Sequence, residues 1–90
     1  MDTITDFLSG TDTIDLSAFG FGPGAAYLGE VNGLAAANSA FTLTAGEIVF
    51  DTSANQVLVD VDGSGDVNAN DLVVELTGVT DLAAADFAFV

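Results

Sequence analysis

The chain has 90 residues, of which 14 are Asp or Glu and none is Lys, Arg or His, so its formal net charge at pH 7 is −14. This charge excludes polyanionic nucleic acid and anionic membrane surfaces as favourable partners. Because His, Cys, Lys and Arg are all missing, the chain lacks the usual catalytic bases, nucleophile activators and phosphate clamps, and we do not expect an enzyme.

The composition nevertheless predicts one small folded domain. Apolar residues make up 50% of the chain and the mean hydropathy is +0.55, unlike a disordered acidic tail. Without basic side chains, the compact state must tolerate repulsion between carboxylates or recruit cations from solution. Without Cys, disulfides and thiolate metal sites are excluded, so calcium remains the candidate staple. No apolar stretch reaches the roughly 18 residues of a membrane-spanning helix, and we expect no membrane insertion.

The first half of the chain predicts two short strands and a long loop. Segments 2–7 and 12–17 each alternate polar with apolar residues, Ile4 and Phe7 in the first and Ile14 and Leu16 in the second. This pattern is typical of short strands with one buried side. Residues 18–46 are rich in Gly and Ala and predict a loop, with a short helix at Leu34–Ala40 as its candidate element.

The second half predicts a hairpin and a returning strand. Residues 47–50 and 56–61 flank a turn cluster at 51–55, residues 72–79 return as a strand, and Thr80 is expected to cap a short helical turn. The predicted fold class is therefore all-β. We expect a small β-sandwich or β-roll-cap-like domain of short antiparallel strands, with a long Gly/Ala-rich loop and a short C-terminal helical turn.

The loop from Asp60 to Asp71 carries the clearest chemical pattern. Calcium takes six to eight oxygen ligands, and this loop has oxygen-bearing side chains at positions 1, 3, 5, 9 and 12 of an EF-hand type loop. Gly65, at position 6, permits the positive φ that folds such a loop around the ion. The candidate metal ligands are the side chains of Asp60, Asp62, Ser64 and Asp71, the backbone carbonyl of Asp66, and Asn68 directly or through water.

Two positions depart from the EF-hand pattern, since Ser64 is neutral and Asp71 stands where a bidentate Glu is usual. The flanking residues are β-branched, so we expect the loop to join strands rather than helices. The alternative interpretation is an acidic hairpin turn that binds no metal, because Asp, Gly, Asn and Ser all favour turns.

The order of these segments resembles the C-terminal region of repeat-in-toxin exoproteins, which include the serralysin-type proteases and related lipases of Gram-negative bacteria. Residues 2–7 and 10–19 are similar to the segment that closes the calcium β-roll of these proteins, and residues 75–79 and 82–87 are similar to their C-terminal end. The glycine-rich nonapeptide of the β-roll is missing, so the resemblance implies the region that follows the repeats.

The resemblance also implies a function. In that family this region caps the β-roll and carries an uncleaved C-terminal signal for type I export through an ABC transporter, often an acidic residue before a few apolar ones, as in 86–90 here. It implies a single domain over residues 1–90, in which 1–19 close the β-roll and 47–90 hold the hairpin, the calcium loop and the terminal signal. The expected partners are calcium, the transporter and the upstream β-roll of the parent protein, and the expected location is extracellular or at the cell surface.

Two alternatives stay open. The loop also follows the repeat of dockerins, with Asp62 and Ser64 as substitutions, although a dockerin carries two such repeats with helices and this chain has one. A calcium-binding interaction module of the dockerin or adhesin type is therefore the second candidate. The apolar residues that follow Asp86 could equally pack into the fold, which is compatible with an export signal because export precedes folding.

Overall fold

The central hairpin of the fold forms where the sequence predicts it. The structure is a computed structural model that describes residues 2–21, 25–67 and 71–88. Strands β4 (Glu47–Asp51) and β5 (Gln56–Asp60) pair antiparallel, with Phe50 opposite Val57. The Asp51 carboxylate closes the turn between them, because it accepts hydrogen bonds from the backbone N–H and the hydroxyl of Ser53 at 2.9 and 2.6 Å.

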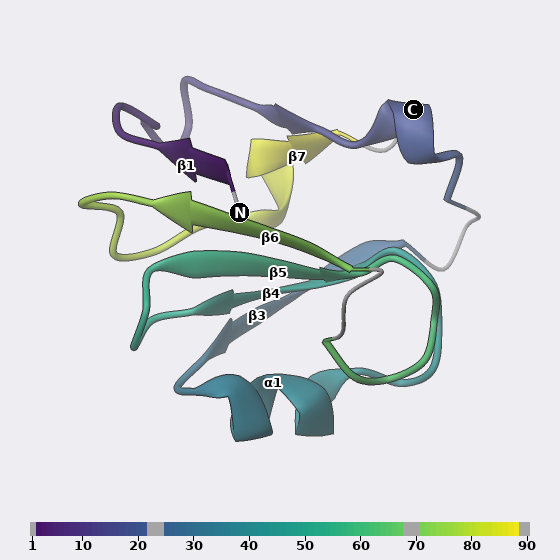
Figure 1. Cartoon of the computed structure of the whole chain (residues 1–90). Coiled ribbons are helices and arrows are strands. Elements are labelled where there is room, and N and C mark those ends of the chain that lie inside the picture. Colours follow the sequence, from purple (N-terminus) through teal and green to yellow (C-terminus); the bar gives the residue numbers. More distant parts are fainter. Residues whose placement is uncertain (1, 22–24, 68–70, 89–90) are drawn as a thin grey trace.

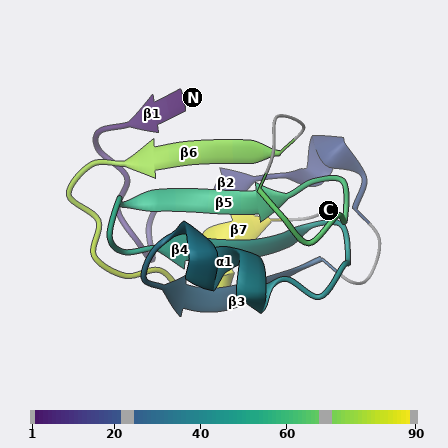
Figure 2. The same ribbon diagram turned by 60° about the horizontal axis from the view of Figure 1, so that its bottom comes forward.

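Among the described residues the hairpin belongs to a five-stranded mixed sheet with the order β1-β6-β5-β4-β3 (Figure 2). β6 (Leu72–Leu76) pairs antiparallel with β5, whereas β1 (Asp2–Ile4) is parallel to β6 and β3 (Ala26–Val31) is parallel to β4. Two short parallel strands, β2 (Ile14–Asp15) and β7 (Phe87–Ala88), form a second sheet. The all-β class is confirmed, but the predicted antiparallel pairing applies only to β4, β5 and β6.

The five-stranded sheet separates two apolar layers. Helix α1 (Leu34–Ala40) covers one face and the β2–β7 pair covers the other (Figure 1). Side chains alternate between the two faces along β4 and β5, and burial of each large apolar side chain contributes roughly 1.5–3 kcal/mol to folding. The β2–β7 layer contains Ile48, Phe50, Val57, Val59, Leu76 and Phe87, and the α1 layer contains Ala37, Phe41, Val49 and Leu58.

The region between residues 18 and 46 is more ordered than the predicted loop. It contains the end of the 3-10 turn η1 (Ser17–Phe19), strand β3 and helix α1, the last at its predicted position. The sequence did not predict β3, because Gly29 interrupts the alternation of polar and apolar residues. The pairing of β3 with β4 also shifts register between Tyr27 and Gly29. β3 and β4 are parallel because a helical crossover joins them.

The C-terminal elements differ from prediction in their bounds. Strand β6 ends at Leu76 rather than at residue 79. The helical turn η2 (Ala84–Asp86) begins after Ala83, so the prediction of Thr80 as its N-cap is wrong.

A buried carboxylate fastens the C-terminal segment to the turn between β1 and β2. Asp86 is 1% exposed and accepts hydrogen bonds from the Ser9 hydroxyl at 2.6 Å and the Gly10 N–H at 2.8 Å. The Ala83 N–H donates a third bond at 2.9 Å. Burial alone would raise the pKa of Asp86, but the three hydrogen bonds outweigh it and hold that pKa below its ordinary value. Phe87, the next residue, is buried in the β2–β7 layer.

Candidate metal centre

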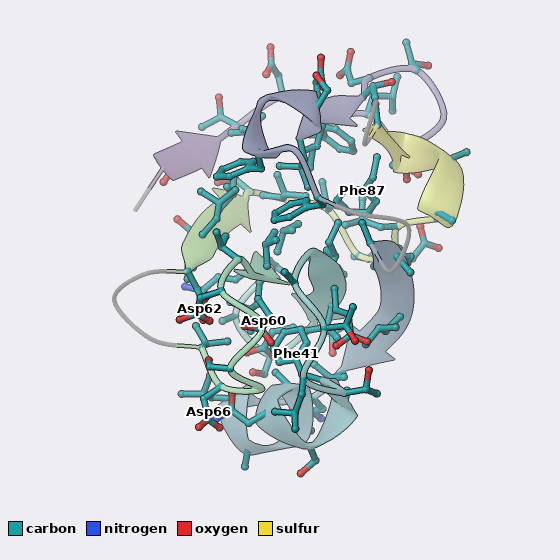
Figure 3. All side chains as sticks on the ribbon, turned by 90° about the vertical axis from the view of Figure 1, so that its right-hand side faces the viewer. Phe41, Asp60, Asp62, Asp66 and Phe87 are labelled. Carbon is teal, nitrogen blue, oxygen red and sulfur yellow. The ribbon has the colours of Figure 1, made fainter. Side chains whose placement is uncertain are left out.

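The predicted calcium loop connects β5 to β6 at one end of the sheet (Figure 2), so its expected strand flanks are confirmed. Because β5 and β6 are antiparallel neighbours, Asp60 at the end of β5 and Asp71 before β6 come together. One carboxylate oxygen from each of Asp60, Asp62 and Asp71 lies within 4.8 Å of the others. Figure 3 shows Asp60 and Asp62 next to each other, with Asp66 farther along the loop toward α1.

Asp60 is the buried member of this group. Its side chain is 0% exposed, its Oδ2 accepts a hydrogen bond from the Gly65 N–H at 2.9 Å, and no donor among the described residues reaches its Oδ1. Burial is the main cause that raises the pKa of Asp60; the Gly65 bond opposes it, and the Asp62 and Asp71 carboxylates raise the pKa further. A buried acceptor without a donor is costly, and a cation at Oδ1 would remove that cost.

The other two carboxylates also fold the loop. Asp71 Oδ1 accepts a hydrogen bond from the Val61 N–H at 2.8 Å and a longer one from the Asp62 N–H at 3.5 Å. Asp62 Oδ1 accepts a hydrogen bond from the Ser64 N–H at 3.1 Å. These bonds hold both carboxylates against the first turn of the loop, beside Asp60.

The remaining predicted ligands lie farther along the loop. The Ser64 hydroxyl donates to the Asp66 backbone carbonyl at 3.1 Å, so the structure brings these two predicted ligand groups together. The Asp66 carboxylate is outside the group of three, and Asn68 lies outside the described residues. Gly65 has φ 85°, as predicted, which lets the loop fold against Leu43 and its neighbours.

A second segment contacts the loop, and the sequence analysis missed it. The Val67 N–H donates to Asn38 Oδ1 of α1 at 3.0 Å, and the Gly46 N–H donates to the Asp60 backbone carbonyl at 2.9 Å. Glu47 is 4% exposed and lies directly opposite Asp60 across β4 and β5. Two signals could have marked these residues: an Asn inside an Ala-rich helix, and a Glu at the start of an apolar strand.

The donor set of the site fits a hard divalent cation. The three grouped side chains offer carboxylate oxygens, which suit calcium, and the sequence has no His or Cys to favour a softer metal. No basic side chain of this sequence can neutralise the three carboxylates. The unpartnered Oδ1 of Asp60 therefore lies where an ion would also offset the local negative charge.

Comparison with known proteins identifies a family. The family described as Peptidase M10 serralysin C terminal matches residues 1–89. Comparisons with curated proteins and with solved structures find no significant match. In the part of the chain that the structure describes, no helix is both long and apolar enough to cross a membrane. The chain belongs to the serralysin C-terminal family, the secretion-related, non-catalytic C-terminal region of repeat-in-toxin type peptidases.

Proposed function

We propose that this chain is the calcium-stabilised, non-catalytic C-terminal module of a secreted bacterial protein, that it carries an uncleaved type I export signal and that it caps a β-roll. The observation that supports the calcium role most directly is Oδ1 of Asp60, which is buried without a donor among the described residues and lies beside two more carboxylates. Calcium supplies the missing partner and offsets charge that no side chain of this sequence can offset.

In this proposal the ion joins two central strands. Asp60 ends β5 and Asp71 precedes β6, so a shared ion fastens these strands where the loop leaves them. Without the ion, three carboxylates within 4.8 Å of one another repel and oppose closure of the loop. The proposed ligands are the carboxylates of Asp60, Asp62 and Asp71, with Ser64, the Asp66 carbonyl and Asn68 completing the shell.

The role as a β-roll cap is supported by the two N-terminal strands. β1 and β2 follow each other in the chain but belong to different sheets, and each is parallel to its described neighbour, β6 or β7. A solenoid of parallel strands grows by stacking each new repeat on its neighbour. An upstream roll can therefore add strands to the outer edges of β1 and β2.

Thermal melts test the calcium role. The protein is melted in about 1 mM calcium, in the same concentration of magnesium, and in chelator, a range in which extracellular calcium modules bind. We expect calcium alone to raise the melting temperature strongly, because magnesium needs a near-ideal octahedral site and dehydrates reluctantly. Equal melting temperatures in calcium and in chelator would remove the site from consideration.

A fusion tests the export role. Residues 1–90 are joined to a slow-folding passenger in a cell that has a type I exporter, and the passenger is measured in the medium. We expect export of the fusion and a sharp reduction after deletion of residues 86–90. Undiminished export after the deletion would show that the terminal apolar residues are only structural, and no export of the intact fusion by a cognate transporter would refute the signal.

A further inference from the structure

The calcium loop is supported from one side by helix α1. Asn38 is half-buried in the middle of this helix, and its Oδ1 accepts the hydrogen bond from the Val67 N–H at 3.0 Å. Asn is a poor residue for a helix interior, where Ala is favoured, so helix propensity does not account for it. The Val67 N–H belongs to the same peptide group as the Asp66 carbonyl. Asn38 therefore holds the peptide that carries one proposed ligand.

Strand β4 adds a further carboxylate, that of Glu47, on the same face of the sheet as Asp60. Glu47 and Asp60 are direct cross-strand partners, so both side chains lie on the α1 face of the sheet, with Cβ atoms about 5 Å apart. Both are buried, at 4% and 0% exposure. Like charges directly opposite each other are unfavourable, and no basic side chain exists in the sequence to separate them.

Glu47 is held in this position by its own contacts. Its two carboxylate oxygens accept hydrogen bonds from the N–H and the hydroxyl of Thr42 at 2.7 and 2.5 Å. The Gly46 N–H, one residue away, donates to the Asp60 backbone carbonyl at 2.9 Å. The loop between α1 and β4 thus holds the Glu47 side chain through Thr42 and contacts the start of the metal loop through the Gly46 N–H.

We propose that Asn38 and Glu47 are positioning residues of the calcium site, an inference that rests on the proposed calcium binding. Asn38 fixes the peptide of the Asp66 carbonyl, so that less order has to be created when the ion binds. Glu47 adds a buried carboxylate opposite Asp60 across β4 and β5, and its negative charge strengthens the attraction of this end of the sheet for a divalent cation. Calcium affinity then depends on α1 and on the start of β4, although neither contains a proposed ligand.

The test measures calcium affinity of the full chain by titration with calcium alone. Asn38→Ala removes the acceptor, and Glu47→Gln removes the charge but keeps a side chain that can hydrogen-bond to Thr42. We expect each variant to raise Kd about tenfold, the low end of the effect of losing an outer-shell partner of a metal ligand. Asn38→Asp, which keeps an acceptor at the same place, is expected to bind within about threefold of wild type.

Two exposed positions give matched controls. Ser39→Ala makes a similar change in helix propensity one residue away, and Glu30→Gln removes one charge from the exposed side of β3. Both controls are expected to bind calcium within about twofold of wild type, because neither residue supports a metal ligand.

The outcomes separate this inference from the proposed function. If wild type binds calcium and both Asn38→Ala and Glu47→Gln bind it equally well, the inference is overturned and the calcium site stands. A lower melting temperature without calcium, at unchanged Kd, would assign them a purely structural role. If wild type does not bind calcium, both this inference and the proposed calcium role are refuted. Should Asn38→Ala not fold, Asn38→Ser, whose shorter hydroxyl does not reach the Val67 N–H, takes its place with the same expected weakening.

Discussion

The substitution Asp60→Asn separates the proposed role of this buried carboxylate as a calcium ligand from its effect on the stability of the calcium-free protein. In the calcium-free protein, Asp60 is a buried charge close to the Asp62 and Asp71 carboxylates, and its Oδ1 has no donor among the described residues. An Asn at this position keeps an acceptor for the Gly65 N–H, removes the charge, and offers its amide N–H groups to the neighbouring carboxylates. We therefore expect the variant to be as stable as wild type, or more stable, when calcium is absent.

In calcium the order reverses. Ligand at ~100 times its dissociation constant stabilises the folded state by about 2.7 kcal/mol. For a domain of 60–100 residues each kcal/mol shifts the melting temperature by about 4–8 °C, so we expect wild type to gain roughly 10–20 °C. Asp60→Asn removes the central charged ligand and is expected to lose most of this gain. Asp60→Asn should therefore melt at the same or a higher temperature than wild type in chelator, and at a lower temperature than wild type in calcium.

The assay is a pair of calorimetric melts, in chelator and in calcium, for wild type, Asp60→Asn and Asp6→Asn. Asp6 is exposed in the turn between β1 and β2, so its substitution makes the same chemical change away from the loop. This control should retain the full effect of calcium. The reasoning is refuted if Asp60→Asn gains as much from calcium as wild type does, or if Asp6→Asn loses the gain as well.

Monovalent salt screens repulsion without filling a site, so about 0.5 M NaCl should raise the melting temperature of the calcium-free protein only in part; if it reproduces the whole effect of calcium, screening alone is at work. The pKa of Asp86 is lowered from 3.8, so its contribution to stability is present above that pH and is lost as the pH falls through the folded value. Urea titrations in chelator should therefore show that the free energy of unfolding falls more steeply with decreasing pH for wild type than for Asp86→Asn. The variant is expected to be about 1–3 kcal/mol less stable at neutral pH, and equal slopes of stability against pH would contradict this. Phe87→Ala should cost about 3–5 kcal/mol because the ring is buried, whereas Phe19→Ala, at a position 47% exposed, should cost much less; similar urea midpoints for both variants would show that the chain end is not packed as described.

The geometry of the loop from Asp60 to Asp71 could be predicted from sequence because its information is local. The spacing from Asp60 to Asp71 is read directly from the chain, and it anticipated that the ends of the loop meet and that Gly65 has a positive φ. Asn38 and Glu47 could not be found this way. The contact of Asn38 with Val67 spans 29 residues, and the pairing of Glu47 with Asp60 depends on strand register. Such neighbours are set by packing, on which a spacing pattern carries no information.

The same distinction between local and long-range information applies to the fold. The hairpin at residues 47–60 and the helix at 34–40 were predictable because turn residues and composition act within a few positions. The parallel pairs were not, because Asp2 lies beside Val74 and Ile14 beside Phe87, residues from opposite ends of the chain. Alternation of polar and apolar residues indicates that such a segment has one buried side, but it does not indicate which strand will pair with it.

Calcium binding and export become linked through β6 if the proposed function holds. The candidate signal region extends from the strand at residues 72–79 to the residues after Asp86, so it includes β6, which begins directly after Asp71. In the fold β6 lies between β5 and β1 with Leu76 fully buried. Farther along, Asp86 fastens the chain end to the turn at Ser9, and Phe87 enters the apolar layer. Leu76, Asp86 and Phe87, three residues of the candidate signal region, are therefore buried in the folded domain. Under the proposed function, repulsion among Asp60, Asp62 and Asp71 in low calcium would favour the open chain and an accessible signal inside the cell, whereas calcium outside would favour the closed sheet that contains β6.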